Sequence, residues 1–586
     1  MKRCPECRRD YVDDTLLYCL DDGNALLEGP ASGKSEPSVA AGGPFDDGPQ
    51  TAILHSTAGP REAPTRAQIH TTEQTAVLPR GAEAEPPGSV GGLSEKYSFS
   101  ANRAAKRLIA VIAAAILLVG GFFGYRYFST ANSKQIESIA VMPFVNASGN
   151  ADAEYLSDGM TETLISSLTQ VPNLNVKARS SVFRYKGKET DTKTLGKELN
   201  VQAILSGRVG HRGDQLTLSL ELVDVASENA IWSQQYTRNQ SGMASLQREI
   251  ARDVSSQLKA RLSGAEMAKV EKSLTTDPKA YELYLKGRFY WNTRTVEDMH
   301  RALDHFKRAV DADPNYALAY TGIADANAIM VAYQVQTSHE GMPKAREAAL
   351  KALQLDDTLA EAHTALAGVY AEYDYDYPAA EHSYKRAIEL NPNYGTARQW
   401  YAEMLGRQGR ADESLRESSI AIQIDPQSQT FNRIHAIGLL LARRYSEAEA
   451  QAKKTLELDR SLPFPYIDLF DIYLMQGKYA EAVESYATWA EMRGEKATAD
   501  EARSAFAKAG WNGALRAMLK TPNIRNYTVA GLNALLGNND EAFAALDRTF
   551  EERTFEIQQI KVDPLFDSLR DDPRYRDLLK RMGLPE

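Results

Sequence analysis

Cysteine is almost absent from this sequence. Its 586 residues contain only Cys4, Cys7 and Cys19, so the chain beyond its first twenty residues has no thiol. A disulfide framework therefore cannot hold its large domains together. The sequence also lacks a Gly-x-Ser-x-Gly elbow and a His-Glu-x-x-His motif, and its nine histidines are scattered without metal-binding spacing. These absences predict that the protein is not an enzyme.

An overall excess of positive charge is missing too, although local basic patches remain possible. The formal net charge is −10 and the pI is near 5.6, which argues against a general affinity for nucleic-acid backbones. With 43% hydrophobic and 25% charged residues the chain has the composition of a folded protein, but it is too long for one hydrophobic core. Several domains are therefore expected.

One long apolar run interrupts the first part of the chain. Leu108–Tyr125 holds eighteen residues without a charge, which is enough to span a bilayer as a helix. A buried core helix is the alternative, but such helices usually carry one polar face and this run has none. No cleavable secretion signal precedes the run. We predict a transmembrane helix with its flanks at residues 103–128.

The charges and glycines around this run predict how the helix is oriented in the membrane and whether two such helices pair. Arg103, Lys106 and Arg107 crowd its amino-terminal side, so the positive-inside rule predicts a cytoplasmic N-terminus and periplasmic or extracellular C-terminal domains. Gly120 and Gly124 form a GxxxG pair, through which two helices could approach closely as a homodimer. The bilayer is thus an expected partner.

The N-terminal segment, residues 1–27, carries all three thiols. Cys4 and Cys7 form a Cys-x-x-Cys pair, and Cys19 is followed at the same spacing by Asp22. This pattern resembles a short zinc ribbon, in which a structural zinc ion takes four ligands, although Asp22 stands where that family usually has cysteine. The alternative is that the three thiols stay reduced and bind no metal.

Residues 28–102 are rich in Gly, Ala, Pro, Ser and Thr, which predicts a disordered linker. The linker contains a near-duplicate, Gln50–Leu54 and Gln74–Leu78. One hypothesis is that Thr51 and Thr75 are phosphorylated and then read by an arginine-bearing module. Chance repetition is the other interpretation.

Strand and helix patterns alternate over residues 136–264 and predict a small α/β domain with a mixed sheet. Leucines at every second position from Leu216 to Leu222 indicate a strand with one buried face, paired in a hairpin with the strand before it. The expected strands are 138–144, 174–179, 201–209, 216–222 and 231–236, and the expected helices are 155–170, 192–199 and 243–262.

The motifs of this region resemble the TolB-like amino-terminal domain of bacterial signalling proteins, which often precedes tetratricopeptide repeats. The resemblance covers residues 136–262, and its carriers are 139–144, 155–162, 179–181, 196–199 and 205–209. It implies a signalling role, without a visible catalytic output module.

Four polar residues are embedded in these motifs. Asp158, Glu162, Arg179 and Arg208 could line a ligand cleft at strand ends, or they could cap helices and form structural ion pairs. The pair Asp158-Gly159 has the character of helix capping and turn chemistry.

Prolines after Asp or Asn recur through the second half of the chain. They stand at Pro278, Pro314, Pro392 and Pro426, and the last two are thirty-four residues apart, which is the tetratricopeptide period. We predict repeats over 278–555, with a loop near residues 334–344, and a C-terminal cap over 556–586.

Stacked helix pairs of this kind form a superhelix whose inner groove is lined by first helices and binds peptides or partner proteins. The repeat register directs five side chains into this groove, namely Gln399, Glu403, Arg407, Arg433 and Asp471.

The expected fold class is therefore multidomain, with a single transmembrane helix, a small α/β domain with a mixed sheet and an all-α tetratricopeptide-repeat solenoid. The predicted function is that of a protein-binding scaffold or signalling protein, single-pass in the bacterial inner membrane. One alternative is a membrane-bound transcriptional regulator that reads nucleic acid with its zinc knuckle, whose basic residues include Lys2 and Arg3. Another is an envelope enzyme with its site in the α/β domain.

Overall fold

The computed structural model describes residues 136–258, 263–270, 275–293 and 295–584, together with three two-residue strands near the N-terminus. These strands are β1 (Lys2–Arg3), β2 (Asp10–Tyr11) and β3 (Leu27–Glu28), and they pair antiparallel in the order β2-β1-β3. The predicted zinc ligands Cys4, Cys7, Cys19 and Asp22 lie outside the described residues. So do Thr51 and Thr75, almost all of the predicted linker, and Gly120 and Gly124.

The expected fold class and location need a correction. Among the residues that the structure describes, no helix is long and apolar enough to cross a bilayer, which contradicts the predicted transmembrane helix and inner-membrane location. The longest helical span, α19 (Lys496–Met518), is interrupted by a kink at Ala509 and Gly510 and has charged side chains along its length, which a bilayer core would disfavour. The segment 103–128, for which the spanning helix was predicted, itself lies outside the described residues.

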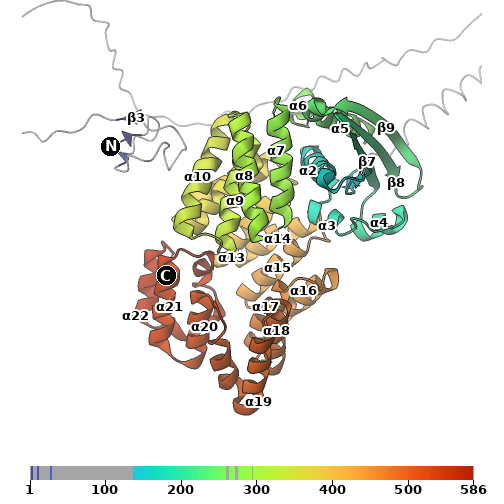
Figure 1. Cartoon of the computed structure of the whole chain (residues 1–586). Helices are drawn as coiled ribbons and strands as arrows, with labels where there is room; N and C mark the ends of the chain where they lie inside the picture. Colours follow the sequence, from blue (N-terminus) through green and yellow to red (C-terminus); the bar gives the residue numbers. More distant parts are fainter. Residues whose placement is uncertain are drawn as a thin grey trace, which may run out of the picture. The chain divides into compact units, whose positions relative to one another are not determined.

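The α/β domain is built on a six-stranded mixed sheet of order β6-β4-β7-β8-β9, with β5 paired to β7. β4 is parallel to β6 and β7, whereas β7, β8 and β9 are antiparallel (Figure 1), and the predicted hairpin of the third and fourth strands is thereby confirmed. The strands are β4 (Ser138–Val141), β5 (Val145–Asn146), β6 (Asn175–Val176), β7 (Ala203–Arg212), β8 (Gln215–Asp224) and β9 (Ala230–Asn239).

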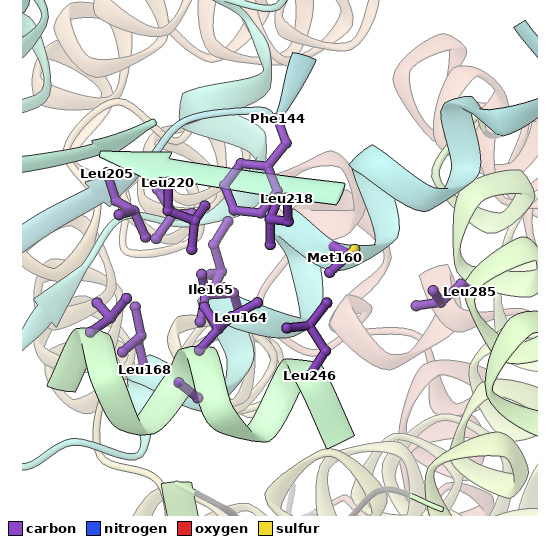
Figure 2. Close-up of a cluster of buried hydrophobic side chains, with 14 of the residues drawn as sticks. Phe144, Met160, Leu164, Ile165, Leu168, Leu205, Leu218, Leu220, Leu246 and Leu285 are labelled. Carbon is purple, nitrogen blue, oxygen red and sulfur yellow. The ribbon is translucent and has the colours of Figure 1, made fainter. Parts of the chain in front are cut away.

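Helices α2 (Glu154–Thr169) and α5 (Met243–Gln257) provide the main cover of one sheet face. Figure 2 shows Leu164 of α2 among side chains from the sheet, such as Leu218, and from α5, such as Leu246. The alternating leucines of β8 are all buried, because the pleat turns every second side chain toward these helices. The local periodicity therefore predicts this core correctly.

Two local expectations in this domain change and one is confirmed. The predicted strand 174–179 is only β6 (Asn175–Val176), and the chain then turns into helix α3 (Arg179–Phe183). The helix predicted at 192–199 is present as α4 (Thr192–Leu199). Asp158 and Gly159 lie inside α2 rather than in a capping turn. Gly159 is needed there for packing, because a Cβ atom at this position would come within 2.9 Å of Leu285.

The second half of the chain is a stack of antiparallel helix pairs (Figure 1). Gly287 and Gly322 belong to the first helices of two successive pairs and both face the ring of Phe306, where an added Cβ would lie 2.5 and 2.7 Å away. Small residues therefore allow large ones to fill the space between helices. The first pairs are α7 (Pro278–Thr293) with α8 (Val296–Ala312), α9 (Ala317–Ala332) with α10 (Ser338–Leu355), and α11 (Ala360–Val369) with α12 (Tyr377–Leu390).

The stack continues with three further pairs and then a less regular C-terminal part. The pairs are α13 (Gly395–Arg407) with α14 (Ala411–Ile424), α15 (Gln429–Leu441) with α16 (Tyr445–Leu458), and α17 (Phe464–Met475) with α18 (Tyr479–Met492). After α19 follow α20 (Asn526–Leu536), α21 (Asn539–Glu551), η4 (Phe555–Gln559), η5 (Pro564–Leu569) and α22 (Pro573–Arg581).

Two features of the stack differ from the pattern that the sequence predicts. The extra residues at 334–344 are only partly a loop, because α10 already begins at Ser338 with a capping box between Thr337 and Glu340. A π-helical turn, η3 (Tyr370–Asp374), follows α11 and displaces the chain before α12.

The α/β domain contacts the loops that join successive repeats. Asn391 donates a hydrogen bond of 3.0 Å to Thr169, and Asn393 donates one of 3.2 Å to the carbonyl of Leu174. Both asparagines lie in the loop between α12 and α13. The polar residues that mark the repeat period therefore also hold the neighbouring domain.

Candidate interaction groove

The concave side of the stack is formed by the first helices of the pairs. Successive first helices from α7 to α17 contact one another directly, which places them on the tighter side of the curve. Side chains that project from this side are expected to contact a partner. We name the part of this side formed by η3, α13, α15 and α17 the inner wall.

Three of the predicted groove residues form one row on α13. Gln399 donates a hydrogen bond of 2.7 Å to Glu403, and Arg407 donates one of 3.1 Å to the same carboxylate. Their spacing of four residues puts them on one face of the helix, as the repeat register predicts. Arg407 also lies 3.8 Å from Glu372 of η3, a residue that sequence reasoning missed.

The other two predicted residues lie on the next two first helices. Arg433 of α15 makes two bonds, of 2.6 and 2.8 Å, to Asp468 of α17. Asp471 lies one turn further along α17, and its pKa is raised well above the usual carboxyl range, first by burial and then by the nearby charges of Asp563 and Asp468. Asp468 and Asp563 are therefore members of the site that the sequence did not single out.

The C-terminal part of the chain returns to this wall. Phe555 of η4 lies with its ring centre 5.4 Å from the guanidinium of Arg407. Asp563 is buried and accepts a hydrogen bond of 2.7 Å from Tyr527. The sequence assigns these residues to the end of the array and its terminal cap, and no periodic pattern marks their return to the middle of the stack.

A small cavity of about 40 Å³ lies where η4 meets the inner wall. Burial raises the pKa of the Glu372 carboxyl to about 7, because desolvation outweighs the opposing charge of Arg407. The cavity is too small for an organic ligand, and its lining includes both polar and aromatic side chains. It is lined by Ala371, Glu372, Tyr384, Trp400, Glu403, Met404, Arg407 and Gln558.

A larger hollow of about 320 Å³ lies between the second helices α12 and α14 and the first helix α13. It is open to solvent and has mixed charge, so its shape and chemistry select no single ligand class. Its lining residues are Lys385, Ile388, Glu389, Tyr401, Leu405, Glu413, Arg416 and Glu417.

The polar residues of the α/β domain form ion pairs. Glu162 pairs with Arg179 at 3.2 Å and also with Arg288 of α7, and these two cations lower the pKa of its carboxyl against the effect of burial. Asp158 lies 2.6 Å from Lys186, and Arg208 is exposed on β7. Asp158, Glu162 and Arg179 thus take part in ion pairs, as one of the two interpretations expects, and Arg208 lies apart from them.

Comparison with known proteins gives one family match and several partial relatives. Residues 134–253 match the family described as HilA/YgeH-like transcriptional regulator, second domain. A putative adenylate cyclase 3 of Rhizobium meliloti (strain 1021) is 31% identical over 190 residues, which are 32% of each chain. The type IV pilus assembly protein PilF of Pseudomonas aeruginosa is 25% identical over 150 residues, which are 25% of this chain and 59% of PilF.

The helix pairs from α7 to α18 form a tetratricopeptide-like repeat array. Among solved structures, that of PilF is 18% identical and covers 41% of this chain and 96% of its own, with a TM-score of 0.25. The structure of YrrB, described as a TPR protein with an unusual peptide-binding site, is 16% identical and covers 34% of this chain and 97% of its own, with a TM-score of 0.24. The chain spans less than two thirds of the length of the curated relatives named here. These matches do not show the TolB-like resemblance or the zinc ribbon.

Proposed function

We propose that this protein is an interaction scaffold that binds protein segments on the inner wall of its repeat array. The observation that carries the proposal is that this wall already accommodates a length of polypeptide, because Phe555 and the residues after it lie against Arg407 and the cavity beside Glu372. Aromatic, charged and amide-bearing side chains together give such a wall the means to recognise a peptide. Gln399, Glu403, Arg407, Arg433 and Asp471 are its proposed contact residues.

A photo-crosslinking experiment tests this proposal. Phe464 is 44% exposed and its ring lies 5.2 Å from the guanidinium of Arg433. A photoreactive residue placed at position 464 can therefore crosslink to a protein that binds the inner wall. Glu389 has a side chain that is 67% exposed on α12 and serves as the matched control. We expect reproducible protein adducts from position 464 and none from position 389. The same adducts from both positions would refute binding at the wall.

Two sequence-based hypotheses accompany this proposal. We propose that a structural zinc ion is held by Cys4, Cys7, Cys19 and Asp22, because three thiolates and a carboxylate supply four ligands. Native mass spectrometry should then find one zinc per chain, and Cys4→Ser should abolish it. A full chain without bound zinc after purification in zinc-supplemented buffer contradicts the assignment.

The other hypothesis is a transcriptional role, and the match of residues 134–253 to the second domain of a regulator family favours it. Nucleic-acid binding would have to come from the N-terminal segment, because the chain as a whole is acidic. An electrophoretic shift assay of the full chain with zinc tests this, and Arg3→Ala should weaken any shift. The similarity to a putative adenylate cyclase covers 32% of each chain, so the activity of that relative is not carried over to this protein.

A further inference from the structure

We propose that residues 555–563, which we name the self-segment, occupy the peptide site of the inner wall as an internal ligand. The external ligand of the same site is then a short peptide in which an aromatic residue is followed directly by a carboxylate. This inference rests on the proposed function and adds two things to it, namely the chemical class of the ligand and the reason why the site is closed in the free protein.

The first anchor of the self-segment is aromatic. The ring centre of Phe555 lies 5.4 Å from the guanidinium of Arg407 and 5.7 Å from that of Arg525. Two guanidinium groups beside one ring favour an aromatic side chain, since its negative face attracts cations. Arg407 is itself held in place by Glu403, so this part of the site is preorganised.

The second anchor is acidic. Glu556 forms an ion pair with Arg525, the same residue that borders the Phe555 ring. Arg525 is held in turn by a hydrogen bond of 3.3 Å to the carbonyl of Ala332 at the end of α9. Arg525 precedes α20 and therefore lies outside the inner wall, but its guanidinium contacts both the aromatic ring and the carboxylate that follows it. Arg407 of the wall and Arg525 beside it together define a site for a two-residue recognition element.

The third contact of the self-segment is a poor fit. Gln558 is 1% exposed and lines the cavity beside Glu372, yet neither its side-chain nitrogen nor its side-chain oxygen has a hydrogen-bond partner among the described residues. Burying an unpaired amide costs free energy, and most buried polar groups in proteins avoid it. This amide is the weak contact of the self-segment, whereas Ile557 and Ile560 beside it are fully buried. A peptide that matches both anchors and also pairs an amide at this place can therefore compete with the self-segment.

Covalent attachment explains why the site is nonetheless closed. A linked segment is present at an effective concentration of order millimolar, so even a modest internal ligand outcompetes a dilute external one. Weakening either anchor should loosen the self-segment from Arg407 and Arg525 without replacing a residue of the inner wall. The prediction is thus a gain of binding on mutation, which a purely structural role of these residues would not produce.

Fluorescence anisotropy of the full-length protein tests the inference. The probe is a labelled peptide with the sequence of residues 551–563, EERTFEIQQIKVD. We expect Phe555→Ala and Glu556→Ala proteins to bind the probe at least about tenfold more tightly than the unmodified chain, because their internal competitor is weaker. Glu389→Ala on α12 is the matched control and should bind as the unmodified chain does. A probe in which alanine replaces the phenylalanine should not bind any of them.

The decisive comparison adds Arg407→Ala to Glu556→Ala, which should remove the gained binding. Far-UV circular dichroism verifies folding, and Glu556→Ala keeps the test valid if Phe555→Ala unfolds, because it leaves the aromatic core contacts in place. Folded variants that bind the probe no better than the unmodified chain overturn the inference. In that case adducts at position 464 would still support the proposed function, whereas their loss would refute that function independently of the probe.

Discussion

Asp425 accepts a hydrogen bond of 2.6 Å from the hydroxyl of Ser181, and these two residues belong to different domains. Asp425 lies in the loop between α14 and α15 and is fully buried, while Ser181 lies in α3 of the α/β domain. The same carboxylate accepts a bond of 3.1 Å from the backbone nitrogen of Ala178. Beside it, the buried Lys177 donates to the carbonyl of Ile424 at 3.1 Å. The landmark aspartate of a repeat is therefore also the anchor of the α/β domain.

Replacing this anchor should loosen the domain contact. Asp425→Ala leaves the Ser181 hydroxyl, the Ala178 amide and the Lys177 charge without their acceptor or counter-charge, and each orphaned buried group costs about 1–3 kcal/mol. We expect a lower unfolding midpoint and faster proteolysis between the two domains. Asp412→Ala in the exposed first turn of α14 is the control and should change neither. An Asp425→Ala protein as resistant to protease as the control would contradict this anchoring role.

Helix packing around Phe306 gives a second prediction. An alanine at Gly287 would place its Cβ 2.5 Å from the Phe306 ring, and the ring is fully buried between helices. Gly287→Ala should therefore destabilise the array by about 1–3 kcal/mol through overpacking. Gly264→Ala at the start of α6 (Gly264–Val270) has open space around its Cβ and should be neutral. Urea unfolding of both variants provides the measurement, and equal midpoints would show that the core can repack.

The sequence predicts much of this fold because its signals are local. Leucine spacing alone specifies α2 and the buried face of β8, and the thirty-four-residue period marks the helix pairs. Similarly, the i to i+4 spacing of Gln399, Glu403 and Arg407 places them on one face of α13. These features need no knowledge of distant parts of the chain.

The remaining part of the candidate site could not be predicted, because it depends on contacts between residues far apart in sequence. Phe555 meets Arg407 across about 150 positions, and nothing in the sequence near either residue indicates this pairing. The π-helical turn that carries Glu372 likewise departs from the repeat pattern, and the periodicity of the sequence does not predict it. Interactions of this kind are determined by the packing of the whole array.

Glu372 should make stability depend on pH. Its pKa is raised to about 7 in the folded protein, from 4.5 in the unfolded chain, so the folded state holds a proton that the unfolded state loses between these values. Stability contributed by this group is present below pH 4.5 and is lost as the pH rises toward 7. The side chain is 32% exposed, so solvent screens part of the effect and we expect a loss of roughly 1–2 kcal/mol.

The matched variant for this prediction is Glu372→Gln, which keeps the shape of the side chain but cannot ionise. Its unfolding midpoint should exceed that of the unmodified protein at pH 8 and should approach it at pH 5. Glu389→Gln, on the exposed face of α12, is the matched control for the substitution itself. A parallel pH profile for Glu372→Gln and the unmodified protein would show that the carboxyl titrates normally in the folded state.

The C-terminal part of the chain is also attached to the stack by a surface ion pair. Arg443, which follows α15, makes two bonds to Asp567 of η5, of 2.6 and 2.7 Å. Both side chains are more than 40% exposed to solvent. We therefore expect a coupling free energy of only about 0.5–1 kcal/mol from a double-mutant cycle with Arg443→Ala and Asp567→Ala.

Because Asp567 also pairs with Arg570 at 2.8 Å, each single variant alters more than one contact, and only the cycle isolates the Arg443 term. This coupling should fall toward zero in 1 M salt, since solvent-exposed charges are screened within about 3 Å at that ionic strength. Asp425, which is buried, should keep its effect in the same salt. A coupling between Arg443 and Asp567 that is unchanged by salt would mean that the pair is shielded from solvent, and that residues 555–569 are held to the array more firmly than their exposure indicates.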